Sequence, residues 1–172
     1  MSKLRYLMML FLAVLVISCG GNEKKEAEEE AAPVKIGAQE TTKETDSNKI
    51  NVGLTGNDLM QYNKNEIKVK AGQEVTLTLR HVGEQELLVM GHNFVLLKPG
   101  TVITEFSIKA AEAGQDADWI PEDGKDVIVH TKMIGGGEST AITFMAPEAG
   151  TYDFICSFPG HSALMKGKFI VE

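Results

Sequence analysis

A thiol, an imidazole and a thioether lie close together in the segment 156–165. Cys156 is followed by His161 and then by Met165, in a C-x4-H-x3-M spacing. Soft sulfur donors combined with an imidazole nitrogen favour copper, because such a set can hold both Cu(I) and Cu(II). The segment therefore predicts a copper site that could pass single electrons.

Two of these residues also have a purely structural interpretation. A free cysteine is usually a small buried hydrophobic residue, and methionine often fills gaps in a core. A mononuclear copper site would need one more nitrogen, and His92 is the best candidate. It follows Gly91, where the missing side chain lets the backbone approach a metal closely.

Composition restricts the class of protein. The chain has 172 residues and a formal net charge of -7, which disfavours a nucleic-acid partner. This length allows one domain with a hydrophobic core plus additional segments. The two cysteines are Cys19 and Cys156, and since Cys19 has another explanation, we expect a domain without a disulfide.

Residues 1–18 have the features of a lipoprotein signal peptide. A short basic start precedes an apolar run, 6–17, that is shorter than the roughly 20 residues needed to span a bilayer. The run leads into Val16-Ile17-Ser18-Cys19-Gly20, which resembles a bacterial lipobox and implies lipidation of Cys19. The alternative is a different cleavage site and an incidental cysteine.

Residues 19–49 predict a disordered polar tether. They are rich in Glu, Lys, Ala and Thr and have few large apolar residues, so they cannot bury enough surface to offset their conformational entropy. The acidic cluster Glu28-Glu29-Glu30 has an alternative interpretation as a sorting or docking signal.

Short apolar segments separated by glycine-containing turns occupy residues 50–172. Most alternate with a period of two, which is typical of half-buried strands. The segment 92–97 is more continuously apolar, which indicates a strand covered on both faces. The predicted strands are 50–55, 66–70, 75–79, 92–97, 127–130, 141–144, 151–156 and 167–171. This pattern predicts an all-β sandwich or barrel.

One stretch interrupts the strands. Residues 106–114 predict a short helix that ends at Gly114. Such a helical insert between two strands would lie outside the sandwich. We interpret Trp119, just beyond it, as local packing and not as a cofactor contact.

Four segments resemble the azurin family of small bacterial blue-copper proteins. They are 56–63, 90–93, 130–135 and 156–167, and they occur in order across the predicted domain. The resemblance implies a Greek-key cupredoxin fold and one copper ion that cycles between Cu(I) and Cu(II). It implies that His92, Cys156 and His161 are the strong ligands, with Met165 as a long axial ligand and the carbonyl of Gly91 as a weak contact opposite it.

The resemblance also implies residues that support these ligands. Asn93 and Ser157 would join the two ligand-bearing segments by hydrogen bonds, and the backbone N–H groups of Asn93 and Phe158 would donate to the Cys156 sulfur. The sequence departs from the family in lacking the cysteine pair of a remote disulfide. It also has Phe94 where relatives often have a buried tryptophan.

A further set of residues matches the apolar collar around the exposed edge of the His161 ring. Individually each would be interpreted as core, but together they predict an exposed apolar docking patch. The members are Met60, Val89, Met90, Phe158, Pro159, Ala163 and Leu164. Small, weak interfaces of this kind suit electron-transfer partners that must exchange rapidly.

Two histidines remain outside the predicted ligand set. His81 matches a family histidine near copper that can titrate with redox state, but a plain structural role is the favoured interpretation. His130 is interpreted as a surface histidine.

The expected function is single-electron transport between respiratory donors and acceptors. The expected partners are redox proteins such as c-type cytochromes, terminal oxidases or reductases. The expected location is the bacterial cell envelope, on a membrane through the lipid anchor, facing the periplasm or the cell surface. Catalysis is disfavoured because four protein ligands would close the site and no other histidine cluster exists in the sequence. Copper delivery is the other alternative, and it would need an exposed and labile site.

Overall fold

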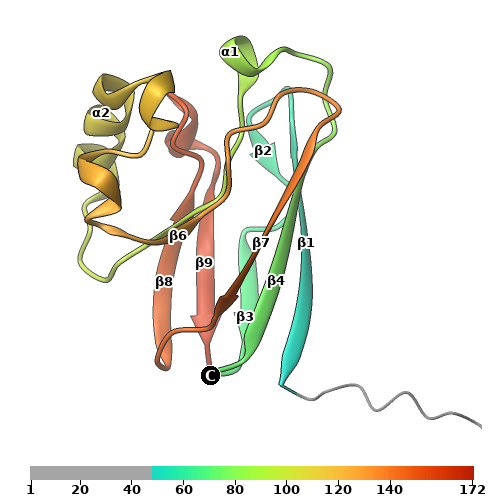
Figure 1. Cartoon of the computed structure of the whole chain (residues 1–172), viewed down its shortest axis with the longest axis vertical. Helices are drawn as coiled ribbons and strands as arrows, with labels where there is room; N and C mark the ends of the chain where they lie inside the picture. The colour runs from blue at the N-terminus through green and yellow to red at the C-terminus, as the bar shows by residue number, and fades with distance from the viewer. Residues whose placement is uncertain (1–47) are drawn as a thin grey trace, which may run out of the picture. The chain divides into compact units, whose positions relative to one another are not determined.

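Two β-sheets pack face to face in the part of the chain that the computed structural model describes, residues 48–172 (Figure 1). The predicted signal peptide and nearly all of the predicted tether lie outside the described residues. One sheet has the strand order β2-β1-β4-β7 and the other β3-β9-β8-β5-β6. The strands are β1 (Lys49–Asn57), β2 (Gln61–Tyr62), β3 (Glu66–Val69), β4 (Glu74–His81), β5 (Val95–Leu97), β6 (Val127–His130), β7 (Ser139–Met145), β8 (Gly150–Ile155) and β9 (Lys166–Val171). The predicted all-β sandwich is confirmed.

The strand β5 is covered on both faces, as its continuous apolar sequence predicts. Leu96 belongs to the core between the two sheets, together with residues such as Leu77 and Phe154. Val95 and Leu97 point the other way, into a second apolar cluster that includes Phe106. That second cluster is formed against the helix α2 (Ile103–Ala113), which therefore lies outside the sandwich as expected (Figure 1).

The helix α2 begins three residues before its predicted start and ends as predicted. The N–H of Gly114 donates to the carbonyl of Ala110 at 3.2 Å, and the backbone of Gly114 then leaves the helix with a φ of 70°. Short 3-10 turns follow at Gln115–Ala117 and Glu122–Gly124. No helix among residues 48–172 is long and apolar enough to cross a membrane.

The prediction that a strand begins at His92 is wrong. His92 makes an isolated bridge with Ile134, in which each backbone N–H donates to the other's carbonyl at 2.9 Å, and β5 begins only at Val95. The chain reaches His92 from a four-residue helix, α1 (Leu87–Met90), that the sequence pattern does not predict. Segments as short as α1 and β2 carry no readable hydrophobic period.

The segment 156–165 connects two paired strands. β8 and β9 are antiparallel neighbours, and Ile155 is the register partner of Lys166. The ten residues between them therefore form the loop of a hairpin, which contains the 3-10 turn His161–Ala163. This arrangement closes the loop at its base by the sheet hydrogen bonds.

Candidate metal centre

Three metal-binding side chains meet beyond the ends of β8 and β5. One ligand atom each from His92, Cys156 and His161 lie within 4.8 Å of one another, and all three residues are buried. The Cys156 Sγ and the His161 Nδ1 are 3.6 Å apart. Among residues 48–172 this is the one such group of histidine, cysteine or acidic side chains.

The spacing of these donors fits a first-row metal ion. Zinc bonds to nitrogen and sulfur are about 2.0–2.3 Å long, and at a trigonal angle such bonds place the two donors about 3.7 Å apart. The observed 3.6 Å between Cys156 and His161 agrees with this value. Thiolate and imidazole donors together are the combination that copper accepts in both of its common oxidation states.

Backbone hydrogen bonds within the loop fix three of the predicted donor residues relative to one another. The His161 N–H donates to the Phe158 carbonyl at 3.0 Å, and the Met165 N–H donates to the His161 carbonyl at 2.8 Å. The Cys156 N–H donates to the Met165 carbonyl at 2.9 Å. Gly160 permits the turn because its φ is 83°, a left-handed conformation that glycine adopts without steric cost.

His92 is positioned by residues that lie far from it in the sequence. Its Nε2 is 2.9 Å from the carbonyl of Asn57, and its Nδ1 is 2.8 Å from the carbonyl of Gly91. In the tautomer whose Nε2–H donates to Asn57, Nδ1 is the nitrogen that can bind a metal. The His81 ring stacks on the His92 ring with centroids 4.2 Å apart and planes 7° from parallel.

Gly56 provides the space that the His92 ring occupies. A Cβ at this position would lie 2.6 Å from the His92 Cδ2 and 3.2 Å from the Met165 Cε, which is too close to the ring. The Met165 side chain is fully buried. Its methyl group and the His92 ring both border the space that Gly56 leaves open. This places the fourth predicted donor at the same end of the sandwich as the other three residues.

Asn93 joins the two ligand-bearing segments. Its amide Nδ2 donates to the Ser157 Oγ at 2.8 Å, and its Oδ1 accepts from the Ser157 N–H at 2.9 Å. The backbone N–H groups of Asn93 and Phe158 both hydrogen bond to the Cys156 sulfur. Donors aimed at this sulfur stabilise a thiolate, which is the form that binds metal.

Burial controls the protonation of the donors. Desolvation raises the pKa of Cys156 to about 12, although the two backbone donors act in the opposite direction. Desolvation also lowers the pKa of His161 to about 4 and lowers the pKa of His92. Both imidazoles are therefore neutral and able to bind metal at pH 7, while metal must displace the thiol proton.

Gly91 lies in a confined position next to the Cys156 sulfur. A Cβ on Gly91 would be 2.6 Å from the Leu87 carbonyl oxygen and 3.0 Å from atoms of Met133 and Phe158. The Gly91 carbonyl oxygen lies 3.7 Å from the Cys156 Sγ and 2.8 Å from the His92 Nδ1. Only glycine can bring this carbonyl to the donor cluster.

Some residues near the centre were not identified as site residues from the sequence. Gly56 is one, and Tyr62 is another, because its hydroxyl donates to the Asn93 carbonyl. Burial raises the pKa of Tyr62 well above its usual value, so it remains a donor. His130, interpreted from the sequence as a surface histidine, is half-buried and lies outside the donor cluster.

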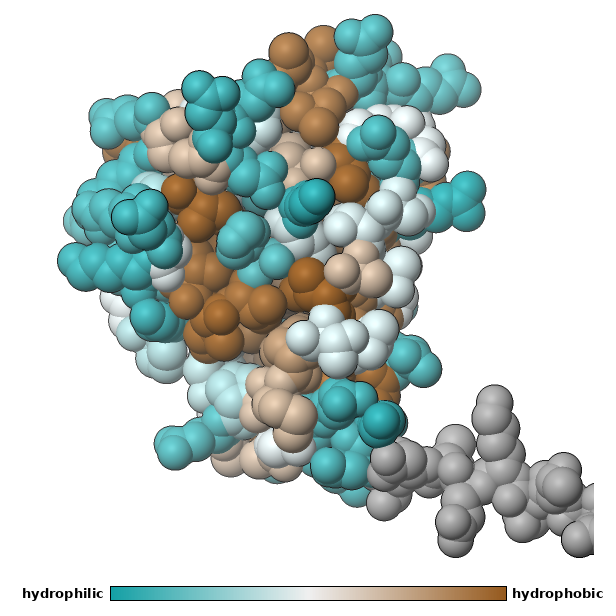
Figure 2. Space-filling view, in the orientation of Figure 1, coloured by the Kyte–Doolittle hydropathy of each residue, from teal (hydrophilic) through white to brown (hydrophobic). Residues whose placement is uncertain are grey.

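The predicted docking patch contains both exposed and partly covered residues. Val89 and Leu164 are 57% and 62% exposed, and Pro159 and Ala163 are also exposed. Met60, Met90 and Phe158 are half-buried. Apolar side chains project at the end of the molecule that carries α1 (Figure 2). Leu59 and Leu88, which are neighbours of Met60 and Val89 in the sequence, are also apolar and are 69% and 61% exposed.

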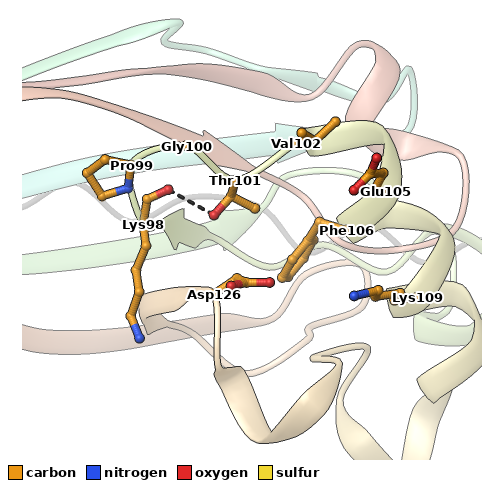
Figure 3. Close-up of a pocket in the computed structure, with 9 residues that line it drawn as sticks. All are labelled: Lys98, Pro99, Gly100, Thr101, Val102, Glu105, Phe106, Lys109 and Asp126. Carbon is orange, nitrogen blue, oxygen red and sulfur yellow. Dashed lines mark hydrogen bonds between the residues drawn. The ribbon is translucent and has the colours of Figure 1, made fainter.

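One hollow of the described region is unrelated to the donor cluster. It has a volume of about 320 Å³ and lies between the start of α2, the preceding loop and Asp126 (Figure 3). Its lining includes Lys98, Lys109 and Glu105, so both signs of charge are present. None of the predicted metal ligands lines it, and we assign it no role.

Comparisons with known proteins agree with this geometry. The family model of copper-binding proteins, plastocyanin/azurin family, matches residues 48–172. Azurin-1 of Alcaligenes xylosoxydans xylosoxydans is 43% identical over 67% of this chain and 92% of its own length. Azurin of Pseudomonas aeruginosa is 43% identical over 70% and 84%.

Two further relatives extend the comparison. Outer membrane protein H.8 of Neisseria gonorrhoeae is 42% identical, but the match covers 67% of this chain and only 63% of the relative's length. Among solved structures, auracyanin A, a "blue" copper protein from Chloroflexus aurantiacus, superposes with a TM-score of 0.65 at 31% identity. That superposition covers 72% of this chain and 99% of auracyanin A.

Proposed function

Because this chain belongs to the plastocyanin/azurin family of copper-binding proteins, we propose that it is a membrane-tethered carrier of single electrons. His92, Cys156 and His161 would hold one copper ion, with Met165 and the Gly91 carbonyl as weaker axial contacts. The buried cluster of two imidazoles and one thiol supports this assignment most directly. Bound copper would supply a Cu(I)/Cu(II) couple that accepts and returns one electron.

The protein's contribution is to keep the donors in one arrangement. Cys156 and Met165 are fully buried and His161 is 3% exposed, so water has little access to them. The hydrogen bonds of Asn93 and the loop hold the thiol and imidazoles in place whether or not the metal charge changes. A fixed set of donors lowers the reorganisation that each electron transfer requires.

The same features argue against catalysis and against copper delivery. Four protein donors leave no open coordination position, which a catalytic metal site needs. Copper delivery requires a labile, exposed site, whereas these donors are buried. Electron transport is therefore the function that fits the geometry best.

The docking patch is where we place electron exchange. Its members include residues on both sides of His161 in the sequence and exposed apolar side chains such as Leu164 and Val89. An apolar patch beside a metal site suits brief contacts with redox proteins, for which we propose c-type cytochromes, terminal oxidases or reductases.

The cell-envelope location is proposed from the N-terminal segment. The lipobox-like sequence at Cys19 supports lipidation, and residues 19–49 would act as the tether. The relative named outer membrane protein H.8 supports an envelope location as well.

Replacement of the thiol tests the metal assignment. Copper-loaded protein should be intensely blue, because thiolate donates charge strongly to Cu(II), and Cys156→Ala should abolish the colour. His130→Ala is the matched control, since this histidine is outside the donor cluster, and it should remain blue. A Cys156→Ala protein as blue as the wild type would exclude the proposed ligand set.

Two further variants test docking and anchoring. Leu164→Glu should slow electron exchange with a c-type cytochrome in stopped-flow measurements without changing the colour. Ile108→Glu is the control, because Ile108 has the same 62% exposure but lies on α2. Cys19→Ala should move the protein from the membrane fraction to the soluble fraction, and continued membrane retention would refute lipidation.

A further inference from the structure

The turn after α2 holds two non-glycine residues in the left-handed conformation. Asp118 has a φ of 53° and Trp119 a φ of 52°. Aspartate tolerates this conformation, but it is unfavourable for a bulky aromatic residue. The backbone is fixed there by hydrogen bonds from the Asp118 N–H to the Gln115 carbonyl at 2.8 Å and from the Trp119 N–H to the Gly114 carbonyl at 2.9 Å. Asp118 and Trp119 contact two different segments next to the metal centre, one each.

Asp118 contacts the chain on the Met133 side. Its two carboxylate oxygens accept from the Met133 N–H at 3.1 and 3.2 Å, a hydrogen bond strengthened by the charge. Met133 is buried and precedes Ile134, the residue that forms the backbone bridge with His92. The Asp118 carboxylate therefore fixes the segment that pairs with His92.

Trp119 contacts the other side of the centre. Its side chain is buried, and its ring packs against the Phe158 ring with centroids 5.3 Å apart and planes at 46°. The Phe158 ring in turn packs against the His161 ring with centroids 4.6 Å apart. The Phe158 N–H also hydrogen bonds to the Cys156 sulfur.

The two contacts converge on Gly91. Atoms of Met133 and Phe158 lie equally near the place where a Gly91 Cβ would be, each at 3.0 Å. Gly91 is thus enclosed between the residue that Asp118 binds and the residue that Trp119 covers. Its carbonyl faces the Cys156 sulfur and the His92 Nδ1.

We propose that Asp118 and Trp119 are positioning residues that clamp Phe158 and Gly91 against the Cys156 sulfur. Trp119 keeps the Phe158 ring in place, and so keeps the Phe158 N–H directed at the sulfur and water away from it. Asp118 holds Met133, and so keeps the Gly91 carbonyl at its distance from the donors. The part of this proposal that concerns copper rests on the proposed ligand set.

The first test needs no metal. In metal-free protein, Trp119→Ala should accelerate hydrogen exchange of the Phe158 amide at least tenfold, and Asp118→Ala should do the same for the Met133 amide. Trp119→Phe and Asp118→Asn retain an aromatic ring and an oxygen acceptor, so they should restore most of the protection. If Trp119→Ala fails to fold, Trp119→Leu replaces it. Leucine and phenylalanine are both large and apolar, so a faster Phe158 amide exchange in Trp119→Leu than in Trp119→Phe would show the effect of the lost ring.

The second test measures the reduction potential of copper-loaded protein. Without Trp119, water would reach the sulfur and favour the more highly charged Cu(II) form. We expect Trp119→Ala to lower the ratio of Cu(I) affinity to Cu(II) affinity at least threefold. This lowers the reduction potential by about 28 mV, at 59 mV per tenfold change. Trp119→Phe should restore most of the lost potential.

A core variant remote from the centre separates positioning from general stability. Val69→Ala removes buried apolar volume in β3 and should lower the global stability. The exchange rate of the Phe158 amide, corrected for global unfolding, should stay unchanged, and so should the reduction potential. If Trp119→Ala behaves like Val69→Ala in both measurements, the clamp is refuted. A wild-type protein that fails to bind copper would instead refute the proposed function, while the exchange results would still decide the clamp.

Discussion

The proposed donors of the metal centre come from two regions that are built in different ways. Cys156, His161 and Met165 lie in one hairpin loop, whose backbone hydrogen bonds join residues at most nine positions apart. His92 instead depends on residues of the distant strand β1, since the Asn57 carbonyl lies against its ring nitrogen and Gly56 leaves space for the ring. One region is local in sequence and the other exists only after the sandwich has formed.

This difference shows what each region requires. The loop needs a closed hairpin base and a glycine at position 160, and its donors then have their spacing. The His92 region needs long-range packing, and the Asn93–Ser157 hydrogen bonds are what join it to the loop. Perturbations that act on one region, or on the link between them, should therefore have separable effects.

Acid should have the largest effect, through His161 in the loop and, in the same direction, through His92, whose pKa burial also lowers. Burial lowers the pKa of His161 from 6.5 to about 4, so the folded state favours the neutral ring. This stabilisation is complete above pH 6.5 and is lost as pH falls toward 4, where the loss reaches about 3 kcal/mol. Urea unfolding of metal-free protein between pH 7.5 and 4 measures it. His161→Gln should reduce the pH dependence by this amount, and an unchanged profile would contradict the burial effect.

The next largest effect should come from the His92 region. Gly56→Ala would place a Cβ 2.6 Å from the His92 ring and should lower the free energy of unfolding by about 2–3 kcal/mol. Gly53→Ala is a matched control in the same strand, because a Cβ there meets no atom within 4 Å. Equal stabilities of the two variants in chemical denaturation would show that His92 does not need this space.

The link between the regions should contribute less. Asn93→Ala leaves the buried Ser157 N–H and hydroxyl without their partner and should cost about 1–2 kcal/mol. We expect this variant also to broaden the range of copper coordination seen by electron paramagnetic resonance, because the two regions are no longer held in register. A sharp, wild-type spectrum would mean that the link is not needed for geometry.

The smallest effect should come from the contact between α2 and the loop. The Ser107 and Ser162 hydroxyls are hydrogen bonded to each other at 2.7 Å, and both residues are half-buried. Ser107→Ala should lower the free energy of unfolding by about 0.5–1 kcal/mol and leave the copper spectrum unchanged. A larger change in the copper spectrum for Ser107→Ala than for Asn93→Ala would show that the contact with α2 matters more to the site than the link between the two regions.

The same difference explains how much could be predicted from the sequence. The spacing of Cys156, His161 and Met165 predicts a soft-metal loop directly, because the loop is local. His92 could only be named a candidate from its glycine neighbour, and its assignment came from a family resemblance. Gly56 and Tyr62 carry no local signal, since their importance lies in contacts with residues at least 31 positions away.

For the fold as well, local features could be predicted from the sequence and long-range features could not. Alternating segments predicted most strands to within two residues, and continuous apolar sequence predicted the doubly covered β5. The strand expected at His92 failed because its backbone pairs with Ile134 and then departs from the sheet. That pairing depends on a residue 42 positions away, so no local pattern could reveal it.

The hairpin that carries the loop has a consequence for the order of events during folding. Antiparallel hairpins close within about 1–10 μs, whereas sandwiches with distant strand pairings, such as the parallel pair β3 and β9, fold in milliseconds to seconds. A chain whose β8 and β9 have paired already presents a thiol, an imidazole and a thioether, while His92 arrives only when the two sheets come together. Copper that is present early would thus meet three of its four proposed side-chain donors before the fold is complete. The order of metal uptake and folding would then depend on when copper is available.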